Sequence, residues 1–179
     1  MPRLVRAEAA YLPSFLDALR EGFSRDNLRP TTPGDIERIE REPDWFLRQV
    51  NHPPNELVLP DGTIGKRVAA TELWYVDGDA FLGSVGIRHE LNEILAEWGG
   101  HIGYAVRPSA QRRGHASAML ADALDHVRAH LPLTRVLLTV NLDNEGSIKV
   151  IEKNGGVLEG EVDNPWVPGK RGRRYWIEL

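Results

Sequence analysis

The strongest constraint on the fold is a strand, a glycine-bearing turn and a long helix that follow one another. Residues 102–106 alternate as in a strand, which must stop at Pro108 because proline cannot extend the ladder. Apolar residues recur at i, i+3 and i+4 spacing from Ala116 to Leu131, so a helix is expected to begin near Gly114. The series therefore predicts a helix N-terminus close to the end of a strand.

Hydrophobic periodicity assigns most of the remaining chain to a mixed α/β sheet. An Asp-Gly-Asp turn at 77–79 predicts a hairpin, because Gly78 supplies positive φ. Asn51 to Gly65, with three prolines, is expected to be a loop. Helices are expected at 12–23, on both sides of a break before Pro43, and at 144–154; strands are expected near Leu4 and at 68–76, 80–88, 135–140 and 173–179.

Length and composition favour one folded domain. The 179 residues fit one unit at roughly 150 residues per domain, and 41% apolar residues supply a core. The formal net charge of −4 does not predict nucleic acid as a partner, and the absence of cysteine excludes disulfides and thiol catalysis. The N-terminus lacks the apolar stretch of a signal peptide, and no segment is long enough to span a membrane, so a cytoplasmic location is expected.

The turn at residues 111–116 has the features of a diphosphate-binding site. The first N–H groups of a helix have no internal partner and carry partial positive charge, so an anion is favoured there. Gly114 leaves room for a phosphate beside the backbone, and Ala116 is also small. From Arg107 to Ala121 the chain carries three cations and no acid: Arg107, Arg112 and Arg113. The alternative is an ordinary solvated loop at an ordinary helix end.

These residues resemble the GNAT acyltransferase superfamily, whose signature is Arg/Gln-x-x-Gly-x-Gly/Ala after the fourth strand. Gln111, Gly114 and Ala116 fill that signature, and the resemblance extends through residues 100–108 and 141–156. It implies a GNAT-like α/β (α+β) fold: a mixed, mostly antiparallel twisted sheet of about six to seven strands, flanked by helices, with splayed fourth and fifth strands. Residues 1–179 would form one domain, with 1–65 as acceptor-side helices and 100–156 as the cofactor-binding core.

The resemblance also implies acetyl-CoA as co-substrate and assigns residues to it. Backbone groups of Tyr104, Ala105 and Val106 would pair with the pantetheine arm. Asn144 and Ser147, with the segment beginning at Asn141, would contact the cofactor from the opposite side, although Asn144 is equally suited to be a helix N-cap. The pyrophosphate would be held by Gln111, Arg112, Arg113, Gly114, His115 and Ala116, with His115 contributing backbone rather than imidazole.

Two positions depart from the family pattern. Ile151 stands where many members have the tyrosine that protonates the leaving thiolate, and Gly156 stands where an aromatic residue is usual. The remaining candidate proton donors are Tyr104, Tyr175 and Ser147. Alternatively the thiolate leaves unprotonated, because a thiol with an ordinary pKa near 8.5 is a fair leaving group. The general acid therefore stays open.

Direct transfer to an amine requires a base, because an ammonium has no free electron pair. The candidates near the fourth strand are Glu90, Glu93, Glu97 and His101. Members of the family often use a carboxylate on or just before that strand, reaching the amine through water, which places Glu97 first and His101 second. A solvated glutamate is the alternative for Glu97.

The acceptor is expected to be a small amine or a peptide amine. Between residues 72 and 97 the chain has six acids and one cation, Arg88. This excess of acids suits a cationic acceptor or a solvent-facing hairpin equally well.

Two other functions stay open: a non-catalytic acyl-CoA-binding regulatory module, suggested by Ile151, and an RNA-binding domain using the basic run at 170–174. No metal site is predicted, since no metal-ligand spacing occurs. A homodimer through strand edges is left open.

Overall fold

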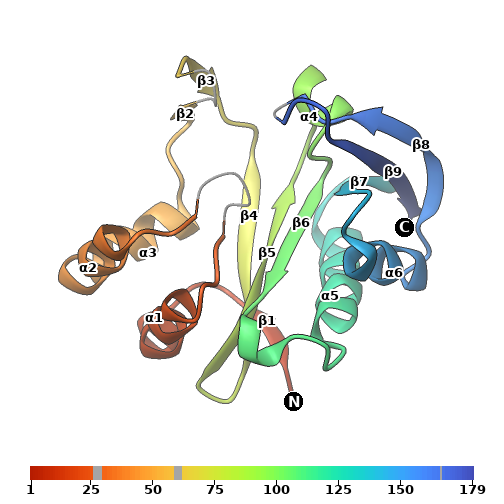
Figure 1. The fold of residues 1–179 in the computed structure, drawn as a ribbon. Coiled ribbons are helices and arrows are strands. Elements are labelled where there is room, and N and C mark those ends of the chain that lie inside the picture. Colours follow the sequence, from red (N-terminus) through yellow and green to blue (C-terminus); the bar gives the residue numbers. More distant parts are fainter. Residues whose placement is uncertain (26–29, 59–61, 166) are drawn as a thin grey trace. The chain divides into compact units, whose positions relative to one another are not determined.

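The computed structural model describes residues 1–25, 30–58, 62–165 and 167–179 (Figure 1). Its contacts divide the chain into two compact units, and each is described by itself below. Unit 1 comprises Met1–Pro53, Glu72–Val85 and Tyr104–Met119; unit 2 comprises Pro54–Thr71, Gly86–Gly103 and Leu120–Leu179. Among the described residues, no helix is long and apolar enough to cross a membrane. The single-domain expectation stays a prediction.

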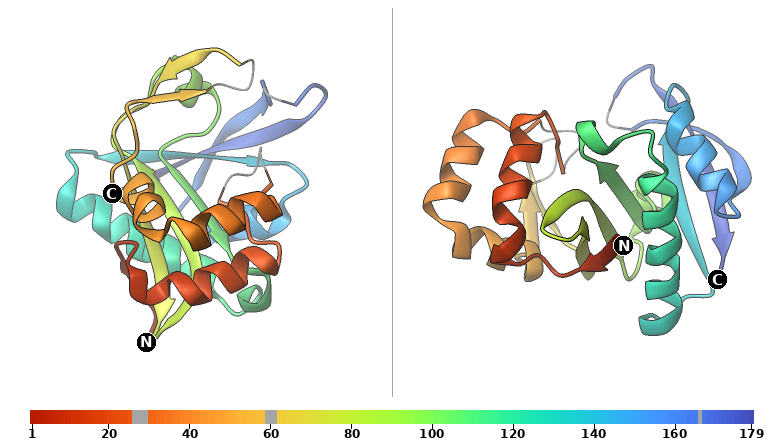
Figure 2. Two further views of the ribbon diagram at one scale, coloured as in Figure 1. Left: turned by 90° about the vertical axis from the view of Figure 1, so that its left-hand side faces the viewer. Right: turned by 90° about the horizontal axis from the view of Figure 1, so that it is seen from below.

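Unit 1 begins with short helices that lie side by side (Figure 2). A capping box between Thr32 and Asp35 starts the second α-helix, and the chain breaks at Glu42, so that Pro43 can open the third. This confirms the predicted pair of short helices. The elements are η1 (Ala9–Tyr11), α1 (Leu12–Arg20), α2 (Pro33–Arg41) and α3 (Pro43–Asn51).

Aromatic side chains form the core of unit 1. Phe15 from α1 is fully buried and stacks on Trp74 at a ring-centroid distance of 4.6 Å and on Phe46 at 5.2 Å. Phe81 meets Phe15 edge to face at 5.1 Å. Each such ring buries a large apolar area, and the offset and edge geometries add favourable quadrupole contacts. The aromatic positions of the first helices therefore hold them to the hairpin strands.

The strands form three sheets. The largest has the order β1-β4-β5-β6, and a second, antiparallel sheet has the order β7-β9-β8. These two sheets hold seven strands. The family's fourth and fifth strands correspond to β6 and β7, and each of these two lies at the edge of a different sheet. The predicted GNAT-like fold class, with these two strands separated, is confirmed. The bounds are β1 (Arg3–Val5), β4 (Ala70–Asp77), β5 (Ala80–Arg88), β6 (Ile102–Val106), β7 (Arg135–Asn141), β8 (Val157–Asp163) and β9 (Arg171–Glu178).

The predicted loop at 51–65 was wrong in part, and β8 was not predicted. A small hairpin of β2 (Glu56–Val58) and β3 (Ile64–Lys66) occupies much of the loop region; Pro60 and Asp61, which belong to the predicted loop, lie outside the described residues. Both missed elements lack a buried face: Val58 and Ile64 are 72% exposed, and β8 is an edge strand with a register shift between Leu158 and Gly160. Hydrophobic periodicity arises from a buried face, so it could not predict strands that have none.

Two of the remaining helices were predicted, and the two short ones, at residues 93–97 and 108–110, were not. The long helix begins at His115, directly after Gly114, and the Asn144-led helix is present. Their bounds are α4 (Glu93–Glu97), η2 (Pro108–Ala110), α5 (His115–His130) and α6 (Glu145–Lys153).

Gly100 brings two backbone segments of unit 2 unusually close. It forms an isolated antiparallel bridge with Leu138 and has a φ of 63°. A Cβ on Gly100 would lie 2.3 Å from the carbonyl oxygen of Leu137, which is backbone and cannot move aside. Only glycine fits both the conformation and the space.

We expect Gly100→Ala to lower the free energy of unfolding by about 2–4 kcal/mol, because it adds backbone strain and a steric clash. The measurement is a urea titration followed by circular dichroism. Gly103→Ala is the control, since a Cβ at Gly103 meets nothing within 4 Å. Equal midpoints for the two variants would contradict the close approach at Gly100.

Candidate active site

The turn before α5 lies in unit 1 and presents backbone N–H groups. Arg112 has a φ of 59° and Gly114 a φ of 84°, so the chain reverses twice before the helix starts. The N–H of Ala118 makes the first helical bond, 3.1 Å to the carbonyl of Gly114. The N–H groups of His115 and Ala116 therefore precede any intrahelical bond, and they form the positive end of the helix dipole.

The side chains around this turn leave the backbone at Gly114 uncovered. Gln111 donates from Nε2 to the carbonyl of Val106 at 3.2 Å, which ties the turn to the end of β6. A Cβ on Gly114 would meet nothing within 4 Å, and Arg112 and Arg113 are exposed. The His115 ring meets the edge of Tyr75, 6.2 Å between centroids, which fits its predicted backbone role. These features fit a diphosphate.

Arg107 is not part of this cation set, contrary to the sequence interpretation. Its Nε and Nη2 donate to the carboxylate of Glu21, and Nη1 donates to the Ser14 hydroxyl and the Phe81 carbonyl. Glu21 also accepts from the N–H and hydroxyl of Ser109. The hydrogen bonds from Arg107 and then Ser109 lower the pKa of Glu21 to about 2. The network fixes the start of the turn against α1.

The predicted pantetheine segment, Tyr104, Ala105 and Val106, lies on an edge strand. β6 has β5 as its one neighbour in the sheet order, and the N–H of Arg107 continues that pairing to Leu82 at 2.9 Å. A Cβ on Gly83 would lie 2.3 Å from the carbonyl oxygen of Ala105. An edge strand presents backbone groups to whatever lies beside it.

In unit 2, His101 is buried, and both its backbone and its ring are hydrogen-bonded to the backbone of Leu137. Its N–H donates to the carbonyl of Leu137 at 2.7 Å, and its Nδ1 accepts from the N–H of Leu137 at 2.9 Å. A ring that accepts at Nδ1 carries its proton at Nε2. Burial and then the nearby Arg88 charge lower the pKa of His101, so the ring is neutral at physiological pH. Glu97, at the end of α4, is exposed.

The start of α6, also in unit 2, shows the predicted N-cap. The side chain of Asn144 accepts from the N–H of Ser147 at 3.1 Å. Asn141 accepts from the side chain of Asn164 at 3.3 Å. Capping and cofactor contact remain compatible, because an amide group has both an acceptor and donors.

Ile151 and Gly156, the two departures from the family pattern, are in direct contact. Ile151 is 2% exposed, and the N–H of Gly156 donates to its carbonyl at 2.9 Å. A Cβ on Gly156 would lie 2.4 Å from the Cγ2 atom of Ile151. The same Cβ would lie 2.9 Å from the carbonyl oxygen of Ile151, so both the backbone and the side chain at 151 require glycine at 156, and neither residue carries a hydroxyl.

The basic run at 170–174 is paired rather than open. Lys170 contacts Asp143 at 2.7 Å, Arg173 contacts Glu161 at 3.5 Å and Arg174 contacts Glu159 at 2.8 Å. Acids of β8 and of the turn between β7 and α6 thus neutralise it, which removes the observation that suggested RNA binding. Tyr175, a proposed proton donor, is buried and donates to Glu152 at 3.0 Å.

In residues 1–25, 30–58, 62–165 and 167–179, no group of three His, Cys, Asp or Glu is arranged to hold a metal.

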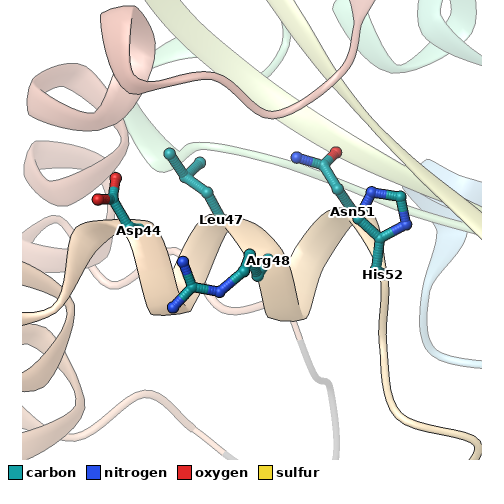
Figure 3. Close-up of a pocket in the computed structure, with 5 residues that line it drawn as sticks. All are labelled: Asp44, Leu47, Arg48, Asn51 and His52. Atoms are coloured by element: carbon teal, nitrogen blue, oxygen red, sulfur yellow. The ribbon is translucent and has the colours of Figure 1, made fainter.

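A shallow hollow on α3 was not predicted (Figure 3). It measures about 300 Å³ and belongs to unit 1. Asn51 anchors one end by donating to the carbonyl of Ala7 at 2.9 Å. The lining residues are Asp44, Leu47, Arg48, Asn51 and His52. They come from one helix and the residue after it, and form no catalytic arrangement.

Comparison with known families identifies the class of protein. The family described as "Acetyltransferase (GNAT) domain" matches residues 25–157, more than half of the chain. The chain therefore belongs to the GNAT acetyltransferase family. Membership makes it an acyl-CoA-dependent N-acetyltransferase that uses acetyl-CoA, as the resemblance predicted. A comparison with curated protein sequences finds no match.

Solved structures share the fold at low sequence identity. A spermidine N-acetyltransferase SpeG chimera from Vibrio cholerae and hSSAT has 17% identity and a TM-score of 0.64, over 99% of this chain and 95% of that chain. A Salmonella typhimurium acetyltransferase that modifies the N-terminal serine of ribosomal protein L7/L12 has 16% identity and 0.65, over 99% and 95%. The microcin C7 self-immunity acetyltransferase MccE, solved with acetyl-CoA and AMP, has 12% and 0.62, over 99% and 92%.

We expect Glu21→Gln to destabilise the chain by about 1–2 kcal/mol at neutral pH, because a carboxylate bound to Arg107 is lost. A lowered carboxyl pKa stabilises the folded state above the unfolded value near 4.5, and this contribution is lost as pH falls toward about 2. The difference in urea midpoint between wild type and variant should therefore shrink across that window. A constant difference down to pH 2 would contradict the assignment.

Proposed function

We propose that the chain acetylates a small amine or a peptide amine in the cytoplasm by direct transfer from acetyl-CoA. The observation that carries the proposal is the open turn at the start of α5, with first-turn N–H groups, two exposed arginines and glycine at the closest approach. A homodimer stays a prediction.

The residues proposed to hold the donor are those that the family resemblance assigns. The backbone of Gly114, His115 and Ala116, together with Arg112 and Arg113, would bind the pyrophosphate, and Gln111 would position the turn. The edge of β6 at 104–106 would pair with the pantetheine amides. Asn144, Ser147 and Asn141 would contact the cofactor at the start of α6. When bound, acetyl-CoA supplies a thioester as the acyl donor.

Glu97 is the preferred base. It is exposed, so water can relay the proton from the amine, whereas the Nδ1 of His101 already accepts from Leu137. His101 would have to break that bond, or release its Nε2 proton, before it could act. Tyr104 and Ser147 remain the candidate proton donors, while Tyr175 donates to Glu152 and Ile151 has no hydroxyl. Catalysis would otherwise rest on holding thioester and amine together.

The amine class is open between the acceptors of the structural neighbours. One neighbour acts on spermidine and another on a protein N-terminal serine. Part of the predicted acidic surface is neutralised here: Glu72 pairs with Arg25, and Asp77 pairs with the N-terminal amine at 3.0 Å. The acidic stretch therefore supports a polycation less than the sequence implied.

We expect Gly114→Val to weaken coenzyme A binding at least tenfold, because a side chain would occupy phosphate space at a φ that disfavours it. Gly155→Val is the matched control: Gly155 has a φ of 87°, and a Cβ there also meets nothing within 4 Å. Both variants should lose similar stability. Calorimetric titration with coenzyme A measures the affinity of each variant. Equal affinities would show that the turn is not the pyrophosphate-binding site.

We expect Glu97→Gln to lower kcat about a hundredfold at neutral pH and much less at high pH, where the amine is already deprotonated. Glu93→Gln, on the same short helix, is the control and should retain the wild-type pH profile. Thiol release from acetyl-CoA gives the rate. Identical pH profiles for Glu97→Gln and wild type would remove Glu97 as base, and coenzyme A binding without turnover on any amine would favour a regulatory module.

A further inference from the structure

Arg88, the last residue of β5, is fixed beside the loop that joins α4 to β6. Its Nη1 donates to the carbonyls of Gly99 at 3.3 Å and Gly100 at 2.9 Å, and its backbone N–H donates to the carbonyl of His101 at 2.7 Å. The two glycines have φ values of 117° and 63°. All of these residues belong to unit 2. The guanidinium is therefore held in place by one of its three nitrogens.

The other two nitrogens of Arg88 form an unused fork. In this chain, Arg25 and Arg107 each direct Nε and Nη2 to one carboxylate, those of Glu72 and Glu21. Nε and Nη2 of Arg88 bind no described group, and no described carboxylate lies within 4 Å of its guanidinium. Such a fork matches a carboxylate bidentately.

The fork is also reachable. In the described part of the chain, the sealed polar side-chain atoms without a hydrogen-bond partner are on Asn51, Trp74, Arg173 and Arg174. Neither Nε nor Nη2 of Arg88 is among them, and the residue is half-buried rather than sealed.

The surroundings of Arg88 are positive rather than acidic. Burial, and then repulsion by Arg67, lowers the pKa of Arg88. Nearby, Thr71 and His89 are joined at 2.9 Å between Oγ1 and Nε2, which occupies both side chains with each other. A half-buried cation without a counter-ion is costly, and an anion at the fork would offset that cost.

We propose that Arg88 binds the acceptor, and that the acceptor is an amine carrying a carboxylate. This rests on the proposed function, which places the base at Glu97, two residues before the first glycine that holds Arg88. The carboxylate would lie on the Nε/Nη2 fork while the amine lies near Glu97. A polycation such as spermidine would be repelled at this point by Arg88 and Arg67. The carboxylate could belong to a free amino acid or to an acidic peptide.

The test compares matched amines that differ only in this charge. One pair is 4-aminobutyrate and 4-aminobutanamide, and the other is the C-terminally amidated dipeptides Ser-Glu and Ser-Gln. We expect wild type to favour the carboxylate member of one pair by at least about tenfold in kcat/KM, as for a charge-assisted bidentate contact. The favoured pair identifies the source, a small molecule or a peptide. No preference in either pair, or better turnover of spermidine, would overturn the proposal.

Variants separate recognition from a purely structural role. Arg88→Gln keeps a side-chain N–H for a glycine carbonyl and lacks the fork, so the ratio of kcat/KM between the carboxylate and the neutral member of the favoured pair should fall to about one. Arg67→Gln, the matched control, should change the preference much less. Equal losses on both members of the pair would mean that Arg88 only supports the loop, and would contradict the proposal.

A binding measurement keeps this inference distinct from the proposed activity. Calorimetry with 4-acetamidobutyrate and the N-acetylated, amidated Ser-Glu should show at least about tenfold tighter binding of one of them to wild type than to Arg88→Gln. If that holds while no amine is acetylated, the proposed function fails and the carboxylate site stands. If amines are acetylated and binding is the same in both proteins, the carboxylate site fails alone.

Discussion

Two hydrogen bonds join His101 to Leu137 beside the isolated bridge between Gly100 and Leu138, where the segment before β6 meets β7. In a regular antiparallel pair, both bonds would join backbone groups. Here the backbone N–H of His101 donates to Leu137, but the N–H of Leu137 donates to the imidazole instead. The side chain thus replaces a ladder partner, and Gly100 allows the approach. Each strand then joins a different sheet, so β6 keeps a backbone edge for a ligand.

The distribution of charge pairs separates structural arginines from those that suit a ligand. Arg25, Arg107 and the arginines of β9 meet carboxylates and hold elements together. Arg88, Arg112 and Arg113 have no ion pair with a described carboxylate. The last two flank the helix N-terminus that suits a diphosphate. Arg88 is hydrogen-bonded to Gly99 and Gly100, which follow the candidate base Glu97 in the chain, so we propose these two groups of arginines for the two anionic parts of the reactants.

Much of the fold follows from local sequence patterns, and what was missed depends on distant partners. The turn at Gly114 and the cap at Asn144 need only neighbouring residues, so periodicity and capping rules find them. Strand β8 is stabilised by pairing with β9 and buries little of its own, so its sequence shows no alternation. Arg107 was assigned to the phosphate because its partner Glu21 lies 86 residues away. The fork on Arg88 is likewise visible only once the glycine carbonyls are placed.

The central claim is that the amides opening α5 bind the diphosphate of acetyl-CoA. Amide hydrogen exchange measured with and without coenzyme A tests it most directly, with pantetheine as the ligand that lacks the diphosphate. The account predicts that coenzyme A slows exchange across residues 113–117 and that pantetheine does not. Slowed exchange elsewhere, with residues 113–117 unchanged under coenzyme A, would contradict it.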